Sequence, residues 1–371
     1  MKFKCSKEDL IIGLNNVSRT VTSKTTMPIL EGVLIETLDN NIKLTTNDLE
    51  IGSEYIIKAD IESSGSTVVD LKTFNEIIRK IESEEITFEI DNNIFVIKST
   101  SGIFKLLTMN PDEFTRLPVF NVDKEVNISE KMFKDMVKKT VFATSNDQNR
   151  PIYTGALVDV VDGVVNIVAI DGFRMAVRKE YLEKSSDFKA IIPAKALTEI
   201  TKTLSDDESC IMKIGVNKNQ ALFRMGPCTV ISRIIEGDFL NYNSIIPADV
   251  DTKVRIAKRK LLEALERVSI FSKEVSEKDK KVPVKINMSL DLFEISCVSV
   301  TGDAKEKVDA VVEGKDLEIG FNPRYLMEAL KVIEDDEIEL NFTSNVLPLI
   351  IRPITGHGYI YMVLPVKLKD E

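Results

Sequence analysis

Few side chains in this sequence have types and spacings that would suit acid–base or nucleophilic chemistry. The single histidine, His357, stands in a glycine-flanked turn, a context typical of a surface residue. Asp171 precedes a glycine, which indicates a turn at least as readily as a catalytic carboxylate, and with Asp159 it forms no convincing acid pair. We find no phosphate-binding loop, dinucleotide-binding glycine motif, nucleophile elbow or zinc-protease motif. The chain is therefore expected to bind or to scaffold, without being an enzyme.

The cysteines give no sign of a metal site, a disulfide framework or a cofactor. They are scattered along the chain and include no closely spaced pair. Buried free thiols in a reducing compartment are the expected state. The four positions are Cys5, Cys210, Cys228 and Cys297. No apolar run is long enough to cross a bilayer and the first residues lead into a polar stretch, so we expect a cytoplasmic protein that has no contact with membranes.

Length and charge bound the architecture and the partners. A chain of 371 residues exceeds what one core usually serves, so two or three domains are expected, and 43% hydrophobic residues support packed cores. The formal net charge of −10 argues against a nucleic-acid partner when taken alone. A polyanion responds to the distribution of charge, however, and the sum does not describe that distribution.

The elements that must position any site form an internal repeat. Residues 7–19, 130–143 and 258–271 each place apolar residues at helical spacing and lie about a third of the chain apart. Further segments of the same kind stand midway between them, at 71–81, 194–204 and 323–333. The repeat predicts three tandem domains over residues 1–124, 125–250 and 251–371.

Between these helices the sequence alternates apolar and polar residues in short runs, which is typical of half-buried antiparallel strands. Residues 91–93, 162–163 and 217–219 carry the Asn, Asp and Gly that tight hairpin turns require. The fold class is therefore α+β, and each domain holds two units of one helix on an antiparallel sheet.

The predicted helices carry mainly basic outer faces, while the acids gather in turns such as 82–85 and 334–339. For any single helix, an ordinary solvated surface explains the charge. Repetition of basic faces in a chain with ten excess acids favours one positive face on an otherwise negative molecule.

Several motifs carry a resemblance to a known family. They are MPIL at 27–30, TTNDLE at 45–50, AIDGFRMA at 169–176, EIGFNPRY at 318–325 and YMVLPVKL at 361–368. In this order and spacing, the chain resembles over its full length the β subunit of bacterial DNA polymerase III, the sliding clamp.

The resemblance implies a head-to-tail homodimer that closes into a ring around duplex DNA, with helices lining the hole and sheets outside. Such a clamp confers processivity by tethering the polymerase, and contacts with phosphates alone suit sliding because they carry no sequence information. The cations expected to contact DNA are Lys24, Arg79, Lys80, Lys138, Lys139, Arg150, Lys195 and Lys202. The dimer interface is expected to join Phe104 and Leu106 of one subunit to Ile270 and Phe271 of the other.

The resemblance also implies a cleft that takes a short, largely apolar peptide from the polymerase catalytic subunit and from the clamp loader. Ile170, Met175, Met362, Leu364 and Pro365 are expected as apolar walls, with Arg174 as a donor at the rim. The other expected residues are Tyr153, Gly172, Phe173, Leu240, Ser244, Ile245, Asn322, Tyr325, Leu347, Val366 and Leu368. Phe173, Leu240 and Ser244 depart from the family pattern and leave the peptide preference open.

Two other functions remain open on the residues themselves. A tandem-repeat α+β interaction protein that does not bind DNA explains the repeat but does not need basic helix faces. A hydrolase that uses the acidic turns needs a convergent carboxylate pair, which the sequence does not offer. Retention on closed circular DNA, with loss from linear DNA, separates these possibilities from a clamp.

Overall fold

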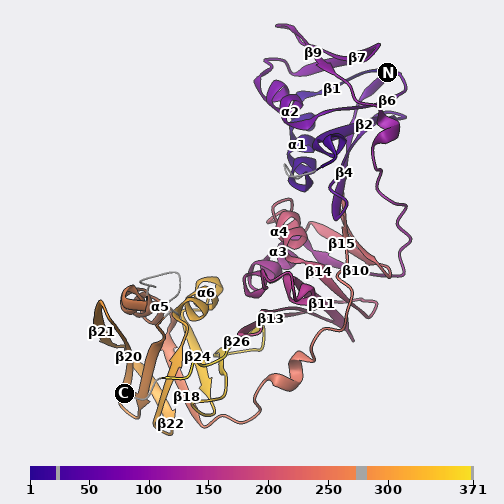
Figure 1. Cartoon of the computed structure of the whole chain (residues 1–371). Helices are drawn as coiled ribbons and strands as arrows, with labels where there is room; N and C mark the ends of the chain where they lie inside the picture. Colours follow the sequence, from indigo (N-terminus) through magenta and orange to yellow (C-terminus); the bar gives the residue numbers. More distant parts are fainter. Residues whose placement is uncertain (22–25, 273–281, 369–371) are drawn as a thin grey trace. The chain divides into compact units, whose positions relative to one another are not determined.

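The computed structural model describes residues 1–21, 26–272 and 282–368. These residues divide into two compact units, one of residues 1–133 with 195–234 and one of residues 134–194 with 235–371. Both units are α+β, with antiparallel sheets throughout, as the sequence predicts (Figure 1). The predicted domain boundaries at 124 and 250 stay a prediction.

The first unit holds a five-stranded and an eight-stranded sheet among its described residues. The smaller sheet has the order β5-β1-β7-β8-β9: β5 (Asp60–Ser63), β1 (Lys2–Ser6), β7 (Glu85–Asp91), β8 (Ile94–Lys98) and β9 (Ile103–Leu107). The larger sheet has the order β10-β15-β16-β17-β4-β3-β2-β6: β10 (Lys124–Ser129), β15 (Ile211–Val216), β16 (Gln220–Met225), β17 (Cys228–Arg233), β4 (Ile51–Lys58), β3 (Asn41–Asn47), β2 (Gly32–Leu38) and β6 (Ser66–Asp70).

The second unit repeats this plan with a nine-stranded and a four-stranded sheet among its described residues. The larger sheet has the order β14-β11-β12-β13-β26-β25-β24-β18-β22: β14 (Phe188–Pro193), β11 (Gly155–Val161), β12 (Val164–Ile170), β13 (Arg174–Tyr181), β26 (Tyr359–Val363), β25 (Leu349–Pro353), β24 (Glu337–Phe342), β18 (Thr252–Ala257) and β22 (Ala310–Gly314). The smaller sheet has the order β21-β20-β19-β23: β21 (Gly302–Lys307), β20 (Leu292–Ser299), β19 (Val284–Ser289) and β23 (Leu317–Phe321).

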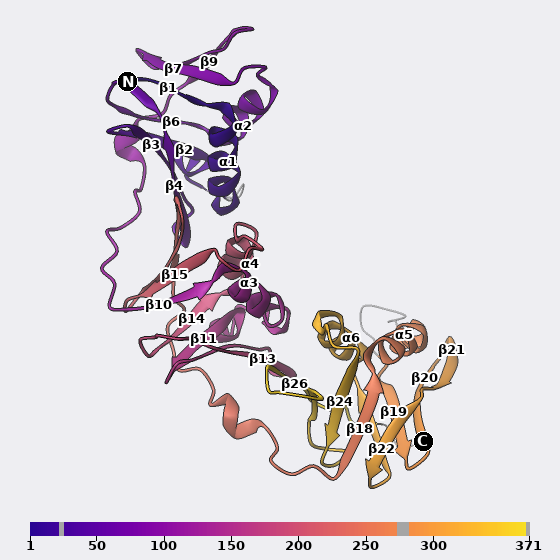
Figure 2. The same ribbon diagram turned by 180° about the vertical axis from the view of Figure 1, so that it is seen from behind.

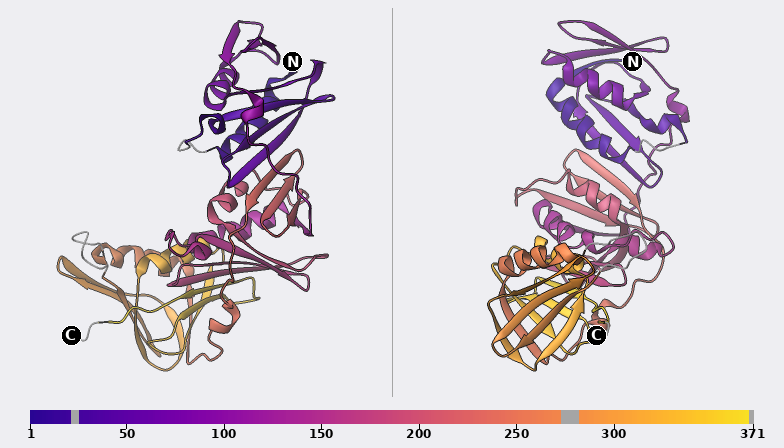
Figure 3. Two further views of the ribbon diagram at one scale, coloured as in Figure 1. Left: turned by 45° about the vertical axis from the view of Figure 1, so that its right-hand side comes forward. Right: turned by 60° about the vertical axis from the view of Figure 1, so that its left-hand side comes forward.

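Each predicted helical segment contains an α-helix. They are α1 (Lys7–Val17), α2 (Leu71–Lys80), α3 (Glu130–Lys138), α4 (Ala194–Thr201), α5 (Lys258–Val268) and α6 (Pro323–Val332). The helices α1 and α2 lie side by side, and so do α5 and α6 (Figures 2 and 3). Their buried stripes follow helical spacing, for example Leu261, Ala264, Leu265 and Val268 on α5. The helical spacing of apolar residues located the helices, because the same residues form the buried stripe that packs each helix on a sheet.

The first helix of each repeat ends earlier than the apolar pattern predicts. Short 3₁₀ turns follow it at η1 (Ser18–Thr20), η4 (Val141–Ala143) and η7 (Ser269–Ser272). At each end a hydroxyl donates back to a carbonyl: Ser18 to Asn15 at 3.2 Å, Thr140 to Met136 at 2.8 Å and Ser269 to Glu266 at 3.1 Å. Such back-bonding competes with the regular helical ladder, which explains the same tightening in all three repeats.

In each unit, the strand pair whose members lie farthest apart in the sequence follows an aspartate turn. In the first unit β17 pairs with β4, and the Arg233 amide donates to the Glu50 carbonyl at 2.9 Å. In the second unit β26 pairs with β13, and the Leu364 amide donates to the Phe173 carbonyl at 2.9 Å. The two joins therefore have the same construction, although the side chains at Glu50 and Phe173 differ.

Candidate functional site

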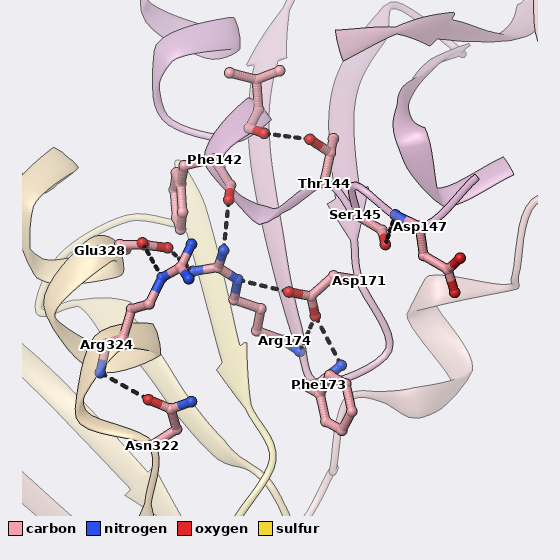
Figure 4. Close-up of polar contacts among 11 residues, drawn as sticks. Phe142, Thr144, Ser145, Asp147, Asp171, Phe173, Arg174, Asn322, Arg324 and Glu328 are labelled. Atoms are coloured by element: carbon pink, nitrogen blue, oxygen red, sulfur yellow. Dashed lines mark hydrogen bonds and ion pairs between the residues drawn. The ribbon is translucent and has the colours of Figure 1, made fainter. Parts of the chain in front are cut away.

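The turn between β12 and β13 brings together much of the predicted peptide site. Asp171 Oδ1 accepts from the backbone amides of Phe173 at 2.8 Å and Arg174 at 3.0 Å (Figure 4). Gly172 has a φ of +93°, a left-handed conformation that glycine adopts without strain. The turn holds Phe173 with 59% of its surface exposed, which is unusual for a phenylalanine in a folded chain.

The next residue, Arg174, does not lie at the rim as the sequence predicted. Its side chain is only 5% exposed, and its Nε donates to Asp171 Oδ2 at 3.0 Å. Its Nη2 donates to the Phe142 carbonyl at 2.7 Å, and its Nη1 is paired with Glu328 on α6 (Figure 4). Because each of its three nitrogens is bonded inside the protein and almost none of the side chain is exposed, Arg174 acts as an internal tie and not as a donor at the surface.

Arg174 also lies within a group of aromatic rings. Its guanidinium carbon is 4.7 Å from the ring centroid of Tyr325 and 5.4 Å from that of Phe142. Tyr325 stacks in turn on Phe173, with ring centroids 6.2 Å apart and planes 19° apart. Burial, followed by the charge of Asp171, raises the pKa of Tyr325. We call Phe142, Arg174, Tyr325 and Phe173 the aromatic column.

The other predicted wall residues fall into two groups. Ile170, Met175 and Met362 are buried in one hydrophobic cluster, against which Tyr153 and Ile245 also pack. Exposed apolar surface is contributed instead by Leu240, Leu347 and Val366. Leu364, Pro365 and Leu368 are half-buried, and Ser244 is exposed. Ile170, Met175 and Met362 thus support the site from beneath, because side chains so deeply buried present almost no surface to a ligand.

Two chain segments are fixed around this cluster by their own contacts. Tyr242 is buried in the cluster and donates its hydroxyl to Asp159 at 2.9 Å, which anchors the segment that carries Leu240. In the segment after β26, the Val366 amide donates to the Gly320 carbonyl of β23 at 2.8 Å. A methyl group on Gly320 would stand 2.8 Å from the Val366 carbonyl, so this contact requires a glycine. Asn322 caps α6, because its side-chain oxygen accepts from the Arg324 amide at 3.1 Å, and its predicted role at the peptide site stays a prediction.

The predicted DNA-contacting cations are of two kinds in the structure. Lys139 is 12% exposed and paired with Asp135 at 2.7 Å and Glu334 at 3.0 Å. Lys195 pairs with Asp48 and Lys202 with Glu199, each at 2.7 Å. The exposed cations Arg79, Lys80, Lys138 and Arg150 have no carboxylate partner within the described ranges. Lys24 lies outside the described residues. Of the predicted DNA contacts, the one by Lys139 has the least support, because its ammonium is both covered and paired with two carboxylates.

Arg150 lies close to the candidate peptide surface, and its contact with DNA stays a prediction. Its Nη1 is 3.7 Å from the position that a Cβ on Gly172 would take, so it stands beside the exposed turn of Phe173. The first turn of α5 carries three further bases that the expected DNA contacts left out: Lys258, Arg259 and Lys260. Arg259 pairs with Glu263 and Lys260 with Asp309, each at 2.7 Å. Three consecutive bases at the start of a predicted helix were the signal in the sequence, because a helix N-terminus already favours anions.

Two of the predicted dimer residues lie on an outer strand, β9, and the other two lie in the turn η7. Phe104 is exposed on β9, the outer strand of the five-stranded sheet, and Leu106 packs partly on the core beneath it. Ile270 is 57% exposed in η7. Phe271 covers Gly302 at the start of β21, the outer strand of the four-stranded sheet: a Cβ on that glycine would be 2.7 Å from the ring.

The catalytic candidates have ordinary structural roles. His357 is exposed, while Asp159 and Asp171 serve separate partners, Tyr242 and Arg174. Over residues 1–21, 26–272 and 282–368, no group of three or more His, Cys, Asp or Glu side chains is placed to hold a metal ion. Burial raises the pKa of Cys5 and Cys228 to about 12, so both thiols stay protonated. No helix in the described chain has the length and apolar character needed to cross a membrane.

The tie between Arg174 and Glu328 should be visible in the pH dependence of stability. Burial alone would raise the pKa of Glu328, but hydrogen bonds from Arg324 and Arg174 outweigh it and lower the pKa below 4.5. A lowered carboxyl pKa stabilises the fold above the unfolded pKa, and this contribution is lost as pH falls through the folded value. Replacing Glu328 with Gln should cost about 1–2 kcal/mol at pH 7, less than a fully buried pair, and should flatten the acid-side loss.

Glu263→Gln is the matched control, because Glu263 also accepts from an arginine four residues earlier, Arg259, but on an exposed surface. It should cost about 0.5 kcal/mol or less. Unfolding midpoints of both variants, measured between pH 3 and pH 7, compare the two losses of stability. Equal losses for the two variants would contradict the role given to Arg174.

Comparison with known proteins places this arrangement in a family. Models of the DNA polymerase III beta subunit match in order: the N-terminal domain over residues 1–118, the central domain over 127–241 and the C-terminal domain over 243–367. The beta sliding clamp of Halalkalibacterium halodurans is 31% identical over 382 residues, which cover 99% of this chain and 100% of that protein.

Solved structures agree with this match. The DNA polymerase sliding clamp from Bacillus subtilis has a TM-score of 0.94 at 31% identity, with 100% of both chains covered. The DNA polymerase III beta subunit from Thermotoga maritima has a TM-score of 0.91 at 26% identity, covering 99% of this chain and 100% of that one. The fold class of three repeated α+β domains is thereby confirmed, and the chain belongs to the family of DNA polymerase III β subunits, the β sliding clamps.

Proposed function

We propose that this chain is the DNA sliding clamp of a bacterial replicative polymerase, a non-catalytic subunit that confers processivity. Two copies form a ring around duplex DNA and tether the polymerase to it. The observation that carries the proposal is the match of all three family domains, in order, over residues 1–367. The helices fit this role because their exposed cations act on phosphates without reading bases.

The lining of the ring depends on which cations remain unpaired. Arg79, Lys80 and Lys138 are exposed and lack carboxylate partners in the described chain, so their charge is available to phosphates. Lys195 and Lys202 are also exposed but pair with carboxylates that DNA would have to displace. A small number of free charges makes weak contacts with a shallow salt dependence, and weak contacts suit a ring that must slide.

Ring closure uses one outer strand from each of the two smaller sheets. The outer strand β9 carries exposed Phe104, and the outer strand β21 lies against Phe271 near exposed Ile270. Unpaired strand edges invite pairing with another chain, and apolar side chains at both edges supply area to bury. The two edges differ, so the contact is heterologous and closes because two copies satisfy each other.

The partner site is the surface around Phe173. We assign to this surface the exposed apolar side chains of Leu240, Leu347 and Val366. Arg150, beside the turn, adds a cation without a carboxylate partner in the described chain. This composition fits a short, mainly apolar peptide from the polymerase catalytic subunit or the clamp loader, fixed by a few polar contacts. The alternative, an interaction protein that does not bind DNA, leaves the free helix cations without a role.

A single charge at the dimer edge should separate the subunits. Replacing Ile270 with Lys places an ammonium in an interface that must be dry, so we expect monomers in sedimentation velocity at micromolar concentration with unchanged thermal unfolding of the domains. Leu290→Lys is the control, because Leu290 is also exposed but lies in the turn between β19 and β20, at the other end of β20 from Gly302 and Phe271. A dimer of unchanged affinity in Ile270→Lys would reject this interface.

Charge reversal of the free helix cations should weaken DNA retention. In the triple variant Arg79→Glu, Lys80→Glu and Lys138→Glu, the slope of log affinity for DNA against log salt concentration should become shallower by about one unit for each cation removed. The control reverses three paired lysines on sheets, Lys98, Lys213 and Lys285. Retention on closed circular DNA, compared with the linearised form across a salt series, measures the effect. If both triple variants behave alike, the helices do not line the ring.

Peptide binding should depend on the exposed apolar surface and not on the dimer. Leu240→Asp, and separately removal of residues 365–371, should weaken binding of a polymerase-derived peptide with Gln and Leu-Phe anchors by about tenfold or more, because each removes apolar contact area. Val161→Asp is the control, an exposed apolar position at the far end of β11. Isothermal titration gives the affinity, and sedimentation should show intact dimers. Wild-type affinity in both variants would displace the peptide site from this surface.

A further inference from the structure

The exposed ring of Phe173 is held more firmly than an exposed side chain usually is. Its amide donates to Asp171 at 2.8 Å and its carbonyl accepts from Leu364 at 2.9 Å, so its backbone is fixed on both sides. One face of the ring stacks on Tyr325, with ring centroids 6.2 Å apart. The side chain nevertheless remains 59% exposed, so most of its surface is free for contact.

Tyr325 is held in turn by Arg174. The guanidinium carbon lies 4.7 Å from the Tyr325 centroid and 5.4 Å from the Phe142 centroid, and its nitrogens are bound to Asp171, Glu328 and the Phe142 carbonyl. The aromatic column therefore runs from Phe142 in η4, through Arg174 and Tyr325, to the exposed ring of Phe173. It joins η4, β13, α6 and the β12–β13 turn through one cation.

We propose that Arg174 is a positioning residue: through Tyr325 it fixes the ring of Phe173 in the orientation that a partner peptide meets, without touching the peptide itself. This inference rests on the proposed peptide surface and adds the group that pre-organises it. A ring fixed before binding loses little rotamer entropy when the peptide arrives, so affinity rises without any new contact.

The proposed positioning role needs the flat guanidinium group, and a positive charge alone would not fulfil it. A lysine would keep one charge near Asp171 and Glu328, but its ammonium is a point donor that offers no flat face to Tyr325. Aromatic and cation–π contacts of this kind are each worth about 0.5–1.5 kcal/mol, which corresponds to about two- to tenfold in affinity when they govern the bound orientation.

Arg178 supplies a matched comparison on the same strand. It is also largely buried and ion-paired, with Nε to Asp135 at 3.3 Å and Nη1 to the Gly358 carbonyl at 2.7 Å. Within the described chain, no stacking contact joins it to Tyr325 or Phe173. An effect that arises only from losing a buried arginine should therefore appear in both Arg174→Lys and Arg178→Lys.

The test uses the absence of tryptophan from the chain. Phe173→Trp gives a single indole fluorophore on the column, and its anisotropy and acrylamide quenching report how firmly residue 173 is held. In this background Arg174→Lys should make the indole at residue 173 more mobile and more easily quenched. It should also lower the affinity for the polymerase-derived peptide by about three- to tenfold. Arg178→Lys should leave the anisotropy, the quenching and the peptide affinity within about twofold of those of Phe173→Trp alone. This holds even if Arg174→Lys and Arg178→Lys both lower the unfolding midpoint.

Tyr325→Leu provides a second variant, which leaves every ion pair of Arg174 in place while it removes the intermediate ring. In the same Phe173→Trp background it should reproduce the more mobile fluorophore and the weaker peptide binding. Unchanged fluorescence and affinity in Arg174→Lys would overturn the positioning role and leave Arg174 as a structural tie. If the unaltered protein fails to bind the peptide, the proposed peptide surface is wrong, while the fluorescence comparison, which needs no ligand, still decides whether Arg174 holds residue 173.

Discussion

The structure depends most on backbone pairing between strands that lie far apart in the sequence. The β4–β17 and β13–β26 pairs turn separate sheets into continuous ones, and their specificity comes mainly from register. Each is reached through an aspartate turn, because Asp48 and Asp171 both accept from the amides two and three residues later. Since one slipped residue would turn every side chain of a strand over, these two carboxylates help to set which face each strand buries.

Much of the fold could be predicted from residue spacing, and the reasons are local. Helical stripes and alternating runs are fixed by the need to bury one face, so the six helices and the hairpin at Asp162 were found. The ends of α1, α3 and α5 were missed because Ser18, Thr140 and Ser269 bond back to carbonyls, a choice of geometry that periodicity does not encode.

The site was harder to predict, because its electrostatics join distant residues. Arg174 was expected to face a ligand, yet its partner Glu328 lies 154 residues later in the chain and turns it inward. The same limit applied to Lys195 and Lys139, whose carboxylates Asp48 and Glu334 come from other elements. A sequence shows that a helix is basic. Whether its charge is available depends on acids that only the fold brings near.

The two aspartate turns also bear on how this surface could change over time. Within each turn, the hydrogen bonds use the aspartate and backbone amides, so the side chain two positions after the aspartate has no part in forming the turn. Glu50 occupies that position in one turn and Phe173 in the other, and both are exposed. A gene built from repeats thus carries this exposed position twice, on two turns of the same construction, so the side chain can change at one turn while the other turn is kept as it is.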